Sequence, residues 1–161
     1  LRVVFGPRDP SYISPILSAI QSDLCESGID GVLSTHIQRD ALEKFSYVSP
    51  IGAAGVYLHA VAGDFQKEGP ARELFKSMIR EISALAAAMG YPFEKDYVKI
   101  NLEILSNLSA DATTSMQRDI MEGKPSELDG LVMEPLRLAK KYSVSMPCYE
   151  EVAKVLCPLE F

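Results

Sequence analysis

The sequence predicts a mainly helical fold, with a helical bundle over residues 37–161 preceded by a strand–helix–strand segment over residues 1–36. Two patterns support this prediction. Beyond residue 36, apolar side chains recur at helical spacing in one segment after another, whereas the first 36 residues place two β-rich runs around one short helix. The 161 residues are 47% hydrophobic and 24% charged, which is typical of a globular protein and excludes a disordered or collagen-like chain.

Residues 1–36 have the pattern of a βαβ unit. Leu1–Gly6 is a β-rich run, Ser14–Pro15 has the residue types of a helix N-terminus, Gly28 is a helix stop, and residues 31–34 form a second short strand. A parallel pair of strands needs further strands and helices to cover it. We therefore interpret this segment as the trailing part of a truncated α/β domain, and we expect the chain to be cut from a longer protein.

A bundle of five or six helices is predicted after residue 36. Pro50 and Pro135 are expected to disturb two of them, because proline has no N–H to donate. Gly63–Asp64 is predicted to break the chain after the first helix, and Ser126–Asp129 has the shape of a capping box that starts the fifth. The predicted helices cover about residues 36–62, 70–90, 94–108, 111–122, 126–141 and 149–156.

Charge and apolar patterning exclude several classes of function. The formal net charge of −6 and the pI near 4.9 lack the basic footprint of a nucleic-acid-binding protein. No apolar run approaches the ~20 residues that a membrane span needs. The three cysteines, Cys25, Cys148 and Cys157, are odd in number and scattered, which favours a reducing, cytoplasmic location over a disulfide scaffold.

Known short motifs for phosphate or metal binding are absent from the sequence. It contains no G-x-G-x-x-G, Walker loop, C-x-x-C or H-E-x-x-H. His36 and His59 have no Cys or His neighbour at ligand spacing, so we predict ordinary histidines and no metal site. The cysteines are expected to be small buried hydrophobes rather than nucleophiles.

Two stretches nevertheless place charged or hydroxyl groups in unusual surroundings. In Ala41–Phe45, Lys44 stands among apolar neighbours, and Thr114–Ile120 is followed by the polar run Lys124–Asp129. The residues alone favour plain roles for both stretches. Lys44 would extend along the helix surface with its amine in water, and Glu127 would stabilise the positive end of a helix dipole.

The second stretch resembles the signature of the ketopantoate reductase family. In Thr114–Leu131, Ser-Met opens a short helix that ends at a basic-polar turn, and Ser-Glu-Leu-Asp follows. Arg137–Pro147 is similar to the closing element of that family. Glu43-Lys44-Phe45 stands in the place of the family's Trp-x-Lys, and Gly63-Asp64-Phe65 in the place of its Gly-Glu-Leu. The resemblance spans the whole helical part.

The resemblance implies a fold, a reaction and three site residues. Residues 37–161 would be a C-terminal helical domain like that of 6-phosphogluconate dehydrogenase, and residues 1–36 the end of a Rossmann-type nucleotide-binding domain. The implied reaction is the NADPH-dependent reduction of ketopantoate to pantoate (2-dehydropantoate 2-reductase) in pantothenate and coenzyme A biosynthesis. Lys44 corresponds to the family's catalytic lysine, Ser115 to its substrate-binding serine and Glu127 to the acid near both.

Elementary chemistry agrees with these roles. Hydride transfer to a ketone leaves negative charge on its oxygen, so a proton donor must be aimed there. An ammonium has a usual pKa of ~10.4, which partial burial would lower and a nearby carboxylate would raise. NADPH would be bound mainly by an absent N-terminal domain with a glycine-rich loop. We therefore expect residues 1–161 alone to be inactive.

The sequence departs from the family at three polar positions. Asparagines usually follow the lysine at four, eight and eighteen residues, but this chain has Val48, Gly52 and Ala62 there. Ser46, Tyr47 or Ser49 could substitute for them. Lost amides weaken discrimination for a hydroxylated keto acid. The alternative is therefore a reductase of the same scaffold for another 2-keto or hydroxy acid, with NADPH against NADH left open.

A third interpretation is a helical dimerisation module without catalysis of its own. The small residues of Ala84–Ala88 would permit close packing between helices of two copies. We expect a homodimer in either case, because helical C-terminal domains of related dehydrogenases often dimerise.

Overall fold

The computed structural model describes residues 1–9, 11, 12 and 14–157. These form two compact units, residues 1–42 and 43–161, and the boundary between the units falls inside one helix, α2 (Ile37–Leu58). The last four residues of the predicted helical domain, 158–161, lie outside the described part of the chain. Each unit is described by itself below.

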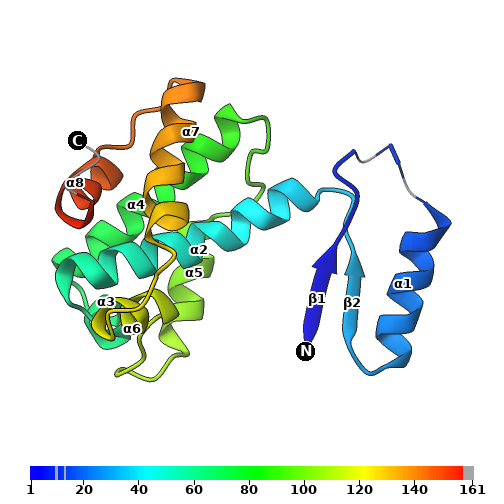
Figure 1. Ribbon diagram of the computed structural model, residues 1–161, viewed down its shortest axis with the longest axis horizontal. Helices are drawn as coiled ribbons and strands as arrows, with labels where there is room; N and C mark the ends of the chain where they lie inside the picture. Colours follow the sequence, from blue (N-terminus) through cyan, green and yellow to red (C-terminus); the bar gives the residue numbers. More distant parts are fainter. Residues whose placement is uncertain (10, 13, 158–161) are drawn as a thin grey trace. The chain divides into compact units, whose positions relative to one another are not determined.

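The first unit is the predicted strand–helix–strand. β1 (Arg2–Phe5) pairs in parallel with β2 (Asp30–Leu33), and α1 (Pro15–Glu26) connects them, as Figure 1 shows in blue. The local signals act as expected. Ser14 accepts a hydrogen bond from the Ile16 N–H at the helix N-terminus, and Gly28 ends the helix with a φ of 77°, which glycine adopts without strain.

None of the α1 side chains is buried within the described chain. Ile16 is 68% exposed and Ile20 is 40% exposed, although both lie on the apolar side of the helix. Val4 on β1 is 40% exposed as well. A helix normally buries its apolar stripe against other elements. The first unit therefore has apolar surface that the other elements of this unit leave uncovered.

The second unit contains the predicted helices with several corrected boundaries. The break predicted at Gly63–Asp64 is instead part of a short helix. The Asp64 carboxylate accepts a hydrogen bond from the Val61 N–H at 2.9 Å, which caps the start of this helix. The capping box predicted at Ser126–Asp129 is not formed, and a π-helical turn begins there. The helices are α3 (Ala62–Gln66), α4 (Pro70–Ala88), α5 (Tyr97–Ser106), α6 (Ser115–Met121), η1 (Asp129–Met133), α7 (Glu134–Tyr142) and α8 (Pro147–Leu156).

Helix α2 continues through Pro50, and a distant side chain replaces the hydrogen bond that the proline removes. In a regular helix the N–H of residue 50 would donate to the carbonyl of Ser46, but proline has no N–H. The buried Asn101 of α5 donates from Nδ2 to that carbonyl at 3.0 Å and to the Ser46 hydroxyl at 3.1 Å. The polar group that Pro50 leaves free is thus satisfied by another helix.

Pro135 creates the same situation in α7. It cannot donate to the carbonyl of Leu131, which instead accepts from the Ser49 hydroxyl of α2 at 2.6 Å. The Ser49 hydroxyl also forms a short hydrogen bond with the hydroxyl of Tyr149 on α8. Ser49 and Tyr149 are fully buried. One serine therefore connects α2, η1 and α8 inside the core.

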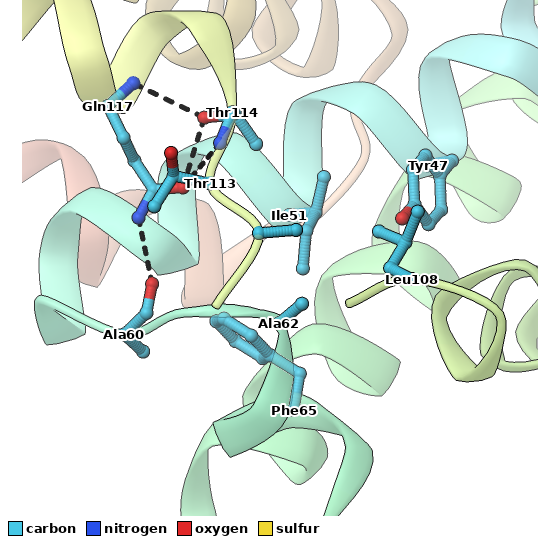
Figure 2. A pocket seen from close by; sticks show the side chains of 10 residues that line it. Tyr47, Ile51, Ala60, Ala62, Phe65, Leu108, Thr113, Thr114 and Gln117 are labelled. Atoms are coloured by element: carbon cyan, nitrogen blue, oxygen red, sulfur yellow. Dashed lines mark hydrogen bonds between the residues drawn. The ribbon is translucent and has the colours of Figure 1, made fainter. Parts of the chain in front are cut away.

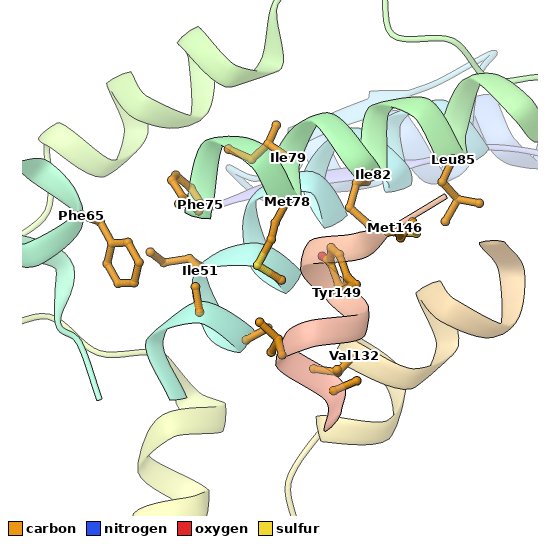
Figure 3. Packing of buried hydrophobic residues seen from close by; sticks show 14 of the residues in the cluster. Ile51, Phe65, Phe75, Met78, Ile79, Ile82, Leu85, Val132, Met146 and Tyr149 are labelled. Carbon is orange, nitrogen blue, oxygen red and sulfur yellow. The ribbon is translucent and has the colours of Figure 1, made fainter. Parts of the chain in front are cut away.

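The core of the second unit lies along α4, which packs against α3, α5, α7 and α8. The apolar side chains that recur at helical spacing in this helix are buried, with the exception of Leu74, which is half-buried. Phe75, the next residue, is fully buried. Figure 3 shows this row of side chains facing Ile51 of α2 and Tyr149 of α8. The buried members of the row are Phe75, Met78, Ile79, Ile82 and Leu85.

Helix α4 also caps the start of α8. The Glu81 carboxylate accepts hydrogen bonds from the N–H groups of Cys148 at 2.8 Å and Tyr149 at 3.1 Å. A carboxylate at a helix N-terminus satisfies free N–H donors and complements the helix dipole.

Each helix in the part of the chain that the structure describes is too short or too polar to span a membrane.

Replacing Asn101 by leucine should leave the Ser46 carbonyl buried without a donor. We expect Asn101→Leu to lower the free energy of unfolding by about 1–3 kcal/mol in a urea titration. Pro50→Ala restores an N–H that can donate to the same carbonyl, so Asn101→Leu should cost less in that background. The exposed control Asn107→Ala should change stability by less than about 0.5 kcal/mol. An equal cost of Asn101→Leu in both backgrounds would contradict this explanation.

Candidate functional site

Lys44 lies on an exposed face of α2, two turns from the start of the helix. Its neighbours Leu42 and Phe45 are half-buried, so the apolar surroundings predicted from the sequence are present. Lys44 itself is exposed in the described chain. Its amine is accessible to a ligand.

Gly52, eight residues after Lys44 and about 12 Å further along the helix, is the point at which two other segments meet α2. A Cβ at this glycine would lie 3.0 Å from the terminal methyl of Met116 and 3.8 Å from Oγ1 of Thr114. It would also lie 3.9 Å from Cδ1 of Leu131. The start of α6 and the π-helical turn η1 therefore pack on the same part of α2.

Ser115 is the first residue of α6, and a capping box fixes its position. The Thr114 hydroxyl accepts from the Gln117 N–H at 3.2 Å, while Oε1 of Gln117 accepts from the Thr114 N–H at 2.9 Å. Nε2 of Gln117 donates to the carbonyl of Ala60 at 2.8 Å. These bonds hold the helix start, and the Ser115 side chain is exposed. The helix therefore begins at Ser115, later than the start predicted at about residue 111.

Glu127 is exposed and precedes η1 by two residues. Its carbonyl accepts from the Leu131 N–H at 2.9 Å, and Leu131 is in turn bonded to Ser49 of α2. Downstream, Arg137 forms ion pairs with Asp129 at 2.7 Å and with Glu134 at 2.8 Å. The backbone at Glu127 is therefore connected to α2 through one residue of η1.

The three predicted site residues thus lie on segments that converge on α2. No hydrogen bond or ion pair found among residues 1–9, 11, 12 and 14–157 joins one of the three side chains to another. Lys44 lies on the helix itself. Ser115 directly precedes Met116, and Glu127 lies four residues before Leu131, and both of those apolar residues contact the Gly52 position. A substrate between the three side chains would have to bridge them.

The three positions without the family's asparagines carry no polar side chain and are at least half-buried. Val48 is half-buried, whereas Gly52 and Ala62 are buried. Of the side chains that could substitute, Ser46 and Ser49 are fully buried in the helix-to-helix bonds described above.

Tyr47 is the third possible substitute. Its hydroxyl is the buried side-chain polar atom that has no hydrogen-bond partner within the described chain. It is therefore available to a ligand.

The surroundings of Cys148 oppose a role as a nucleophile. Burial and a hydrogen bond to Glu81 raise the pKa of the Cys148 thiol to about 11, so this cysteine is a poor nucleophile. Cys25, Cys148 and Cys157 are free thiols, and Cys25 is exposed rather than buried as predicted. The part of the chain that the structure describes contains no group of three His, Cys, Asp or Glu residues that could hold a metal ion.

Comparison with known proteins identifies relatives of this chain. The curated 2-dehydropantoate 2-reductase of Aquifex aeolicus is 26% identical over 158 residues, which is 96% of this chain and 51% of that protein. The chain spans about half the length of the curated relatives it matches. The crystal structure of 2-dehydropantoate 2-reductase from Methylococcus capsulatus has a TM-score of 0.86 and 24% identity, and the match covers 99% of this chain and 50% of that one.

Two further solved structures share the fold at lower identity. A dimeric ketopantoate reductase from Staphylococcus aureus has a TM-score of 0.80 at 19% identity, covering 89% of this chain and 50% of that one. A D-mandelate dehydrogenase with NADH and anilino(oxo)acetate has a TM-score of 0.79 at 18% identity, covering 95% and 64%. Together with the helical architecture described above, these matches confirm the predicted fold class.

Residues 36–160 match the family model described as "Ketopantoate reductase PanE/ApbA C terminal". That match includes Lys44, Ser115 and Glu127, as well as the contacts that bring their segments to α2. The chain belongs to the ketopantoate reductase family, and its helical part is the C-terminal domain of that family.

Proposed function

We propose that this chain is the proton-donating and substrate-binding half of an NADPH-dependent 2-dehydropantoate 2-reductase, which reduces ketopantoate to pantoate in pantothenate and coenzyme A biosynthesis. Lys44 is the proton donor, Ser115 binds the substrate, and Glu127 is the acid beside them. The observation that supports this most is the packing at Gly52, which brings the segments of Ser115 and Glu127 onto the helix of Lys44. Three free thiols agree with a cytoplasmic location.

The chemistry assigns one task to each side chain. NADPH, when bound, supplies the hydride that adds to the ketone carbon. The ketone oxygen then takes a proton from the Lys44 ammonium, which also stabilises the negative charge developing there. The Ser115 hydroxyl donates to the substrate carboxylate. The Glu127 carboxylate orients the lysine ammonium when a substrate lies between the two side chains.

Nucleotide binding is assigned mainly to a preceding domain. No glycine-rich phosphate loop occurs in residues 1–161, and residues 1–36 are proposed to be the end of a nucleotide-binding α/β domain. The exposed apolar side chains Ile16 and Ile20 support this, because further elements of such a domain would cover them. The fold is shared with a D-mandelate dehydrogenase that binds NADH, so NADH is the alternative cofactor.

A different 2-keto or hydroxy acid is the second candidate for the substrate. The buried and side-chain-poor positions Gly52 and Ala62 favour it, since neither supplies an amide for a hydroxylated keto acid. In addition, a Cβ at residue 52 would lie only 3.0 Å from the terminal methyl of Met116, so a larger side chain there would be crowded. The reaction class stays the same in this alternative.

A homodimer is the proposed assembly. One solved relative is described as a dimeric ketopantoate reductase. In the chain itself, Ala84, Ala87 and Ala88 form an exposed strip of small residues on α4. Small side chains allow two helices to approach closely. The third interpretation is that the domain assembles through this strip and has no catalytic role of its own.

Lys44→Ala in the complete protein should lower kcat for ketopantoate reduction by about 10²- to 10⁴-fold, because a positioned general acid contributes that much. The exposed Lys99→Ala on α5 is the matched control and should keep kcat within about twofold. Steady-state kinetics with NADPH measures both variants. Turnover of Lys44→Ala at the rate of the control would remove the lysine from the mechanism.

Glu127→Gln extends the same experiment to the proposed acid. The variant removes the negative charge that is proposed to orient the lysine ammonium, so kcat for ketopantoate reduction should fall more than KM changes. Glu122→Gln, on an exposed residue of the same segment, should leave kcat within about twofold. A kcat of Glu127→Gln equal to that of Glu122→Gln would remove the acid from the mechanism.

The chain of residues 1–161 alone should neither bind NADPH tightly nor reduce a keto acid. The physical reason is that it offers no backbone cradle for the pyrophosphate. Isothermal titration with NADPH and an absorbance assay at the nicotinamide band test this. Detectable reduction by the chain alone would contradict the division of labour proposed here.

Sedimentation equilibrium of the chain should show a dimer that Ala87→Glu converts to a monomer, because charges would face each other across the strip. Ala110→Glu, in an exposed loop, is the control and should leave the dimer intact. A strict monomer at high concentration would oppose this interface.

A further inference from the structure

A cavity of about 170 Å³ lies beside α2 in the second unit. Apolar side chains that include Ile51, Ala62 and Phe65 form its middle. Figure 2 shows Tyr47 at one end and the hydrogen-bonded pair Thr114 and Gln117 at the other. The cavity is therefore an apolar chamber with polar groups at its two ends.

The polar groups at the two ends differ in one respect. Gln117 and Thr114 satisfy each other, and Gln117 also donates to the backbone of Ala60. The Tyr47 hydroxyl is buried and has no partner within the described chain. Its ring is held edge-on against Phe75, with 6.0 Å between the ring centroids, so the hydroxyl has a defined position. Burial raises the pKa of Tyr47, which keeps the phenol protonated and able to donate.

The cavity is close to the proposed catalytic residues along two segments. Lys44, Tyr47 and Ile51 stand at positions i, i+3 and i+7, which share one face of a helix. Thr114, which lines the opposite end, directly precedes Ser115. Ala62 in the wall occupies a position where the family usually has an asparagine. A keto acid held at the exposed side chains of Lys44 and Ser115 would thus lie next to two of the segments that line the chamber.

The volume indicates what kind of group fits. An apolar cavity of about 150 Å³ stays dry and accepts benzene. A chamber of about 170 Å³ therefore accepts a ring or a branched alkyl group together with one small polar atom. Leaving a buried hydroxyl unpaired is unfavourable, so an occupant with an acceptor near Tyr47 gains over one without it.

We propose that this cavity binds the apolar side chain of the 2-keto acid substrate, and that Tyr47 determines specificity by donating a hydrogen bond to an acceptor oxygen on that side chain. The proposal rests on the proposed function for the identity of the substrate as a keto acid. Tyr47 thereby replaces the amides absent at residues 48, 52 and 62.

Binding of two small probes to the chain tests the cavity without catalysis. Benzyl alcohol carries the ring and the hydroxyl, and toluene carries the ring alone. Both should shift backbone amide resonances of cavity-lining residues in a ¹H–¹⁵N spectrum. Tyr47→Phe should weaken benzyl alcohol about fivefold to tenfold and leave toluene binding unchanged or tighter.

Two control variants define the site. Ala112→Leu adds a side chain to the cavity wall and should weaken both probes equally. Tyr142→Phe removes a phenol hydroxyl outside the cavity and should change neither affinity. No binding of either probe, or a benzyl alcohol affinity that Tyr47→Phe leaves unchanged, would overturn the proposal.

Turnover by the complete protein separates this inference from the proposed function. Ketopantoate is compared with 3,3-dimethyl-2-oxobutanoate, which lacks only the hydroxyl. Tyr47→Phe should raise KM for ketopantoate about fivefold to tenfold at unchanged kcat and leave the analogue unaffected. If Lys44→Ala abolishes turnover while Tyr47→Phe affects both substrates alike, the inference fails and the proposed function stands. If probes bind as expected but Lys44→Ala keeps full turnover, the proposed function fails and the cavity stands.

Discussion

The replacement of two missing helix hydrogen bonds by buried side chains of other helices is the constraint on which the second unit depends. Pro50 and Pro135 each free a carbonyl one turn earlier, at Ser46 and Leu131. A buried carbonyl without a donor costs about 1–3 kcal/mol, a large part of the stability of a small domain. Both carbonyls are satisfied only when α5 and α2 take their places. Local irregularities therefore specify long-range packing.

The proposed site inherits its geometry from these bonds. The Ser49 hydroxyl fixes Leu131, and Leu131 lies against the Gly52 position together with Met116. A glycine at residue 52 allows the close approach, because a larger residue would have to displace the methyl of Met116. The backbone of Ser115 and of Glu127 is set in this way, while their side chains stay exposed. Rigid backbone and free side chains are what a substrate-binding surface needs.

The sequence predicts those parts of the fold that local signals determine. Ser14–Pro15 and Gly28 mark the ends of α1, and the spacing of Met78, Ile82 and Leu85 marks the buried face of α4. The short helix α3 and the π-helical turn η1 were not predicted. The first depends on a single capping carboxylate, and the second on a hydrogen bond between residues 82 positions apart. Such contacts have no local pattern.

The same division holds for the candidate site. A family signature over residues 114–131 points to Ser115 and Glu127, and the lysine follows from its place in Ala41–Phe45. The residues alone already favour an exposed Lys44, whereas the unpaired hydroxyl of Tyr47 could not be predicted, since it depends on which helices cover that face of α2. Ser46, Tyr47 and Ser49 look alike in the sequence as possible hydrogen-bonding groups. In the fold, Ser46 and Ser49 form structural hydrogen bonds, whereas the Tyr47 hydroxyl has no partner within the described chain and is available to a ligand.

The pairing of Pro50 with Asn101 also limits how the sequence can evolve. Either residue alone is unfavourable, because a proline without the amide leaves a buried carbonyl unpaired, and an amide without the proline finds that carbonyl already bonded. The two positions, 51 residues apart in sequence, are thus expected to change together among relatives. A lineage that loses the proline becomes free to replace the asparagine with an apolar residue, whereas a lineage that keeps it does not.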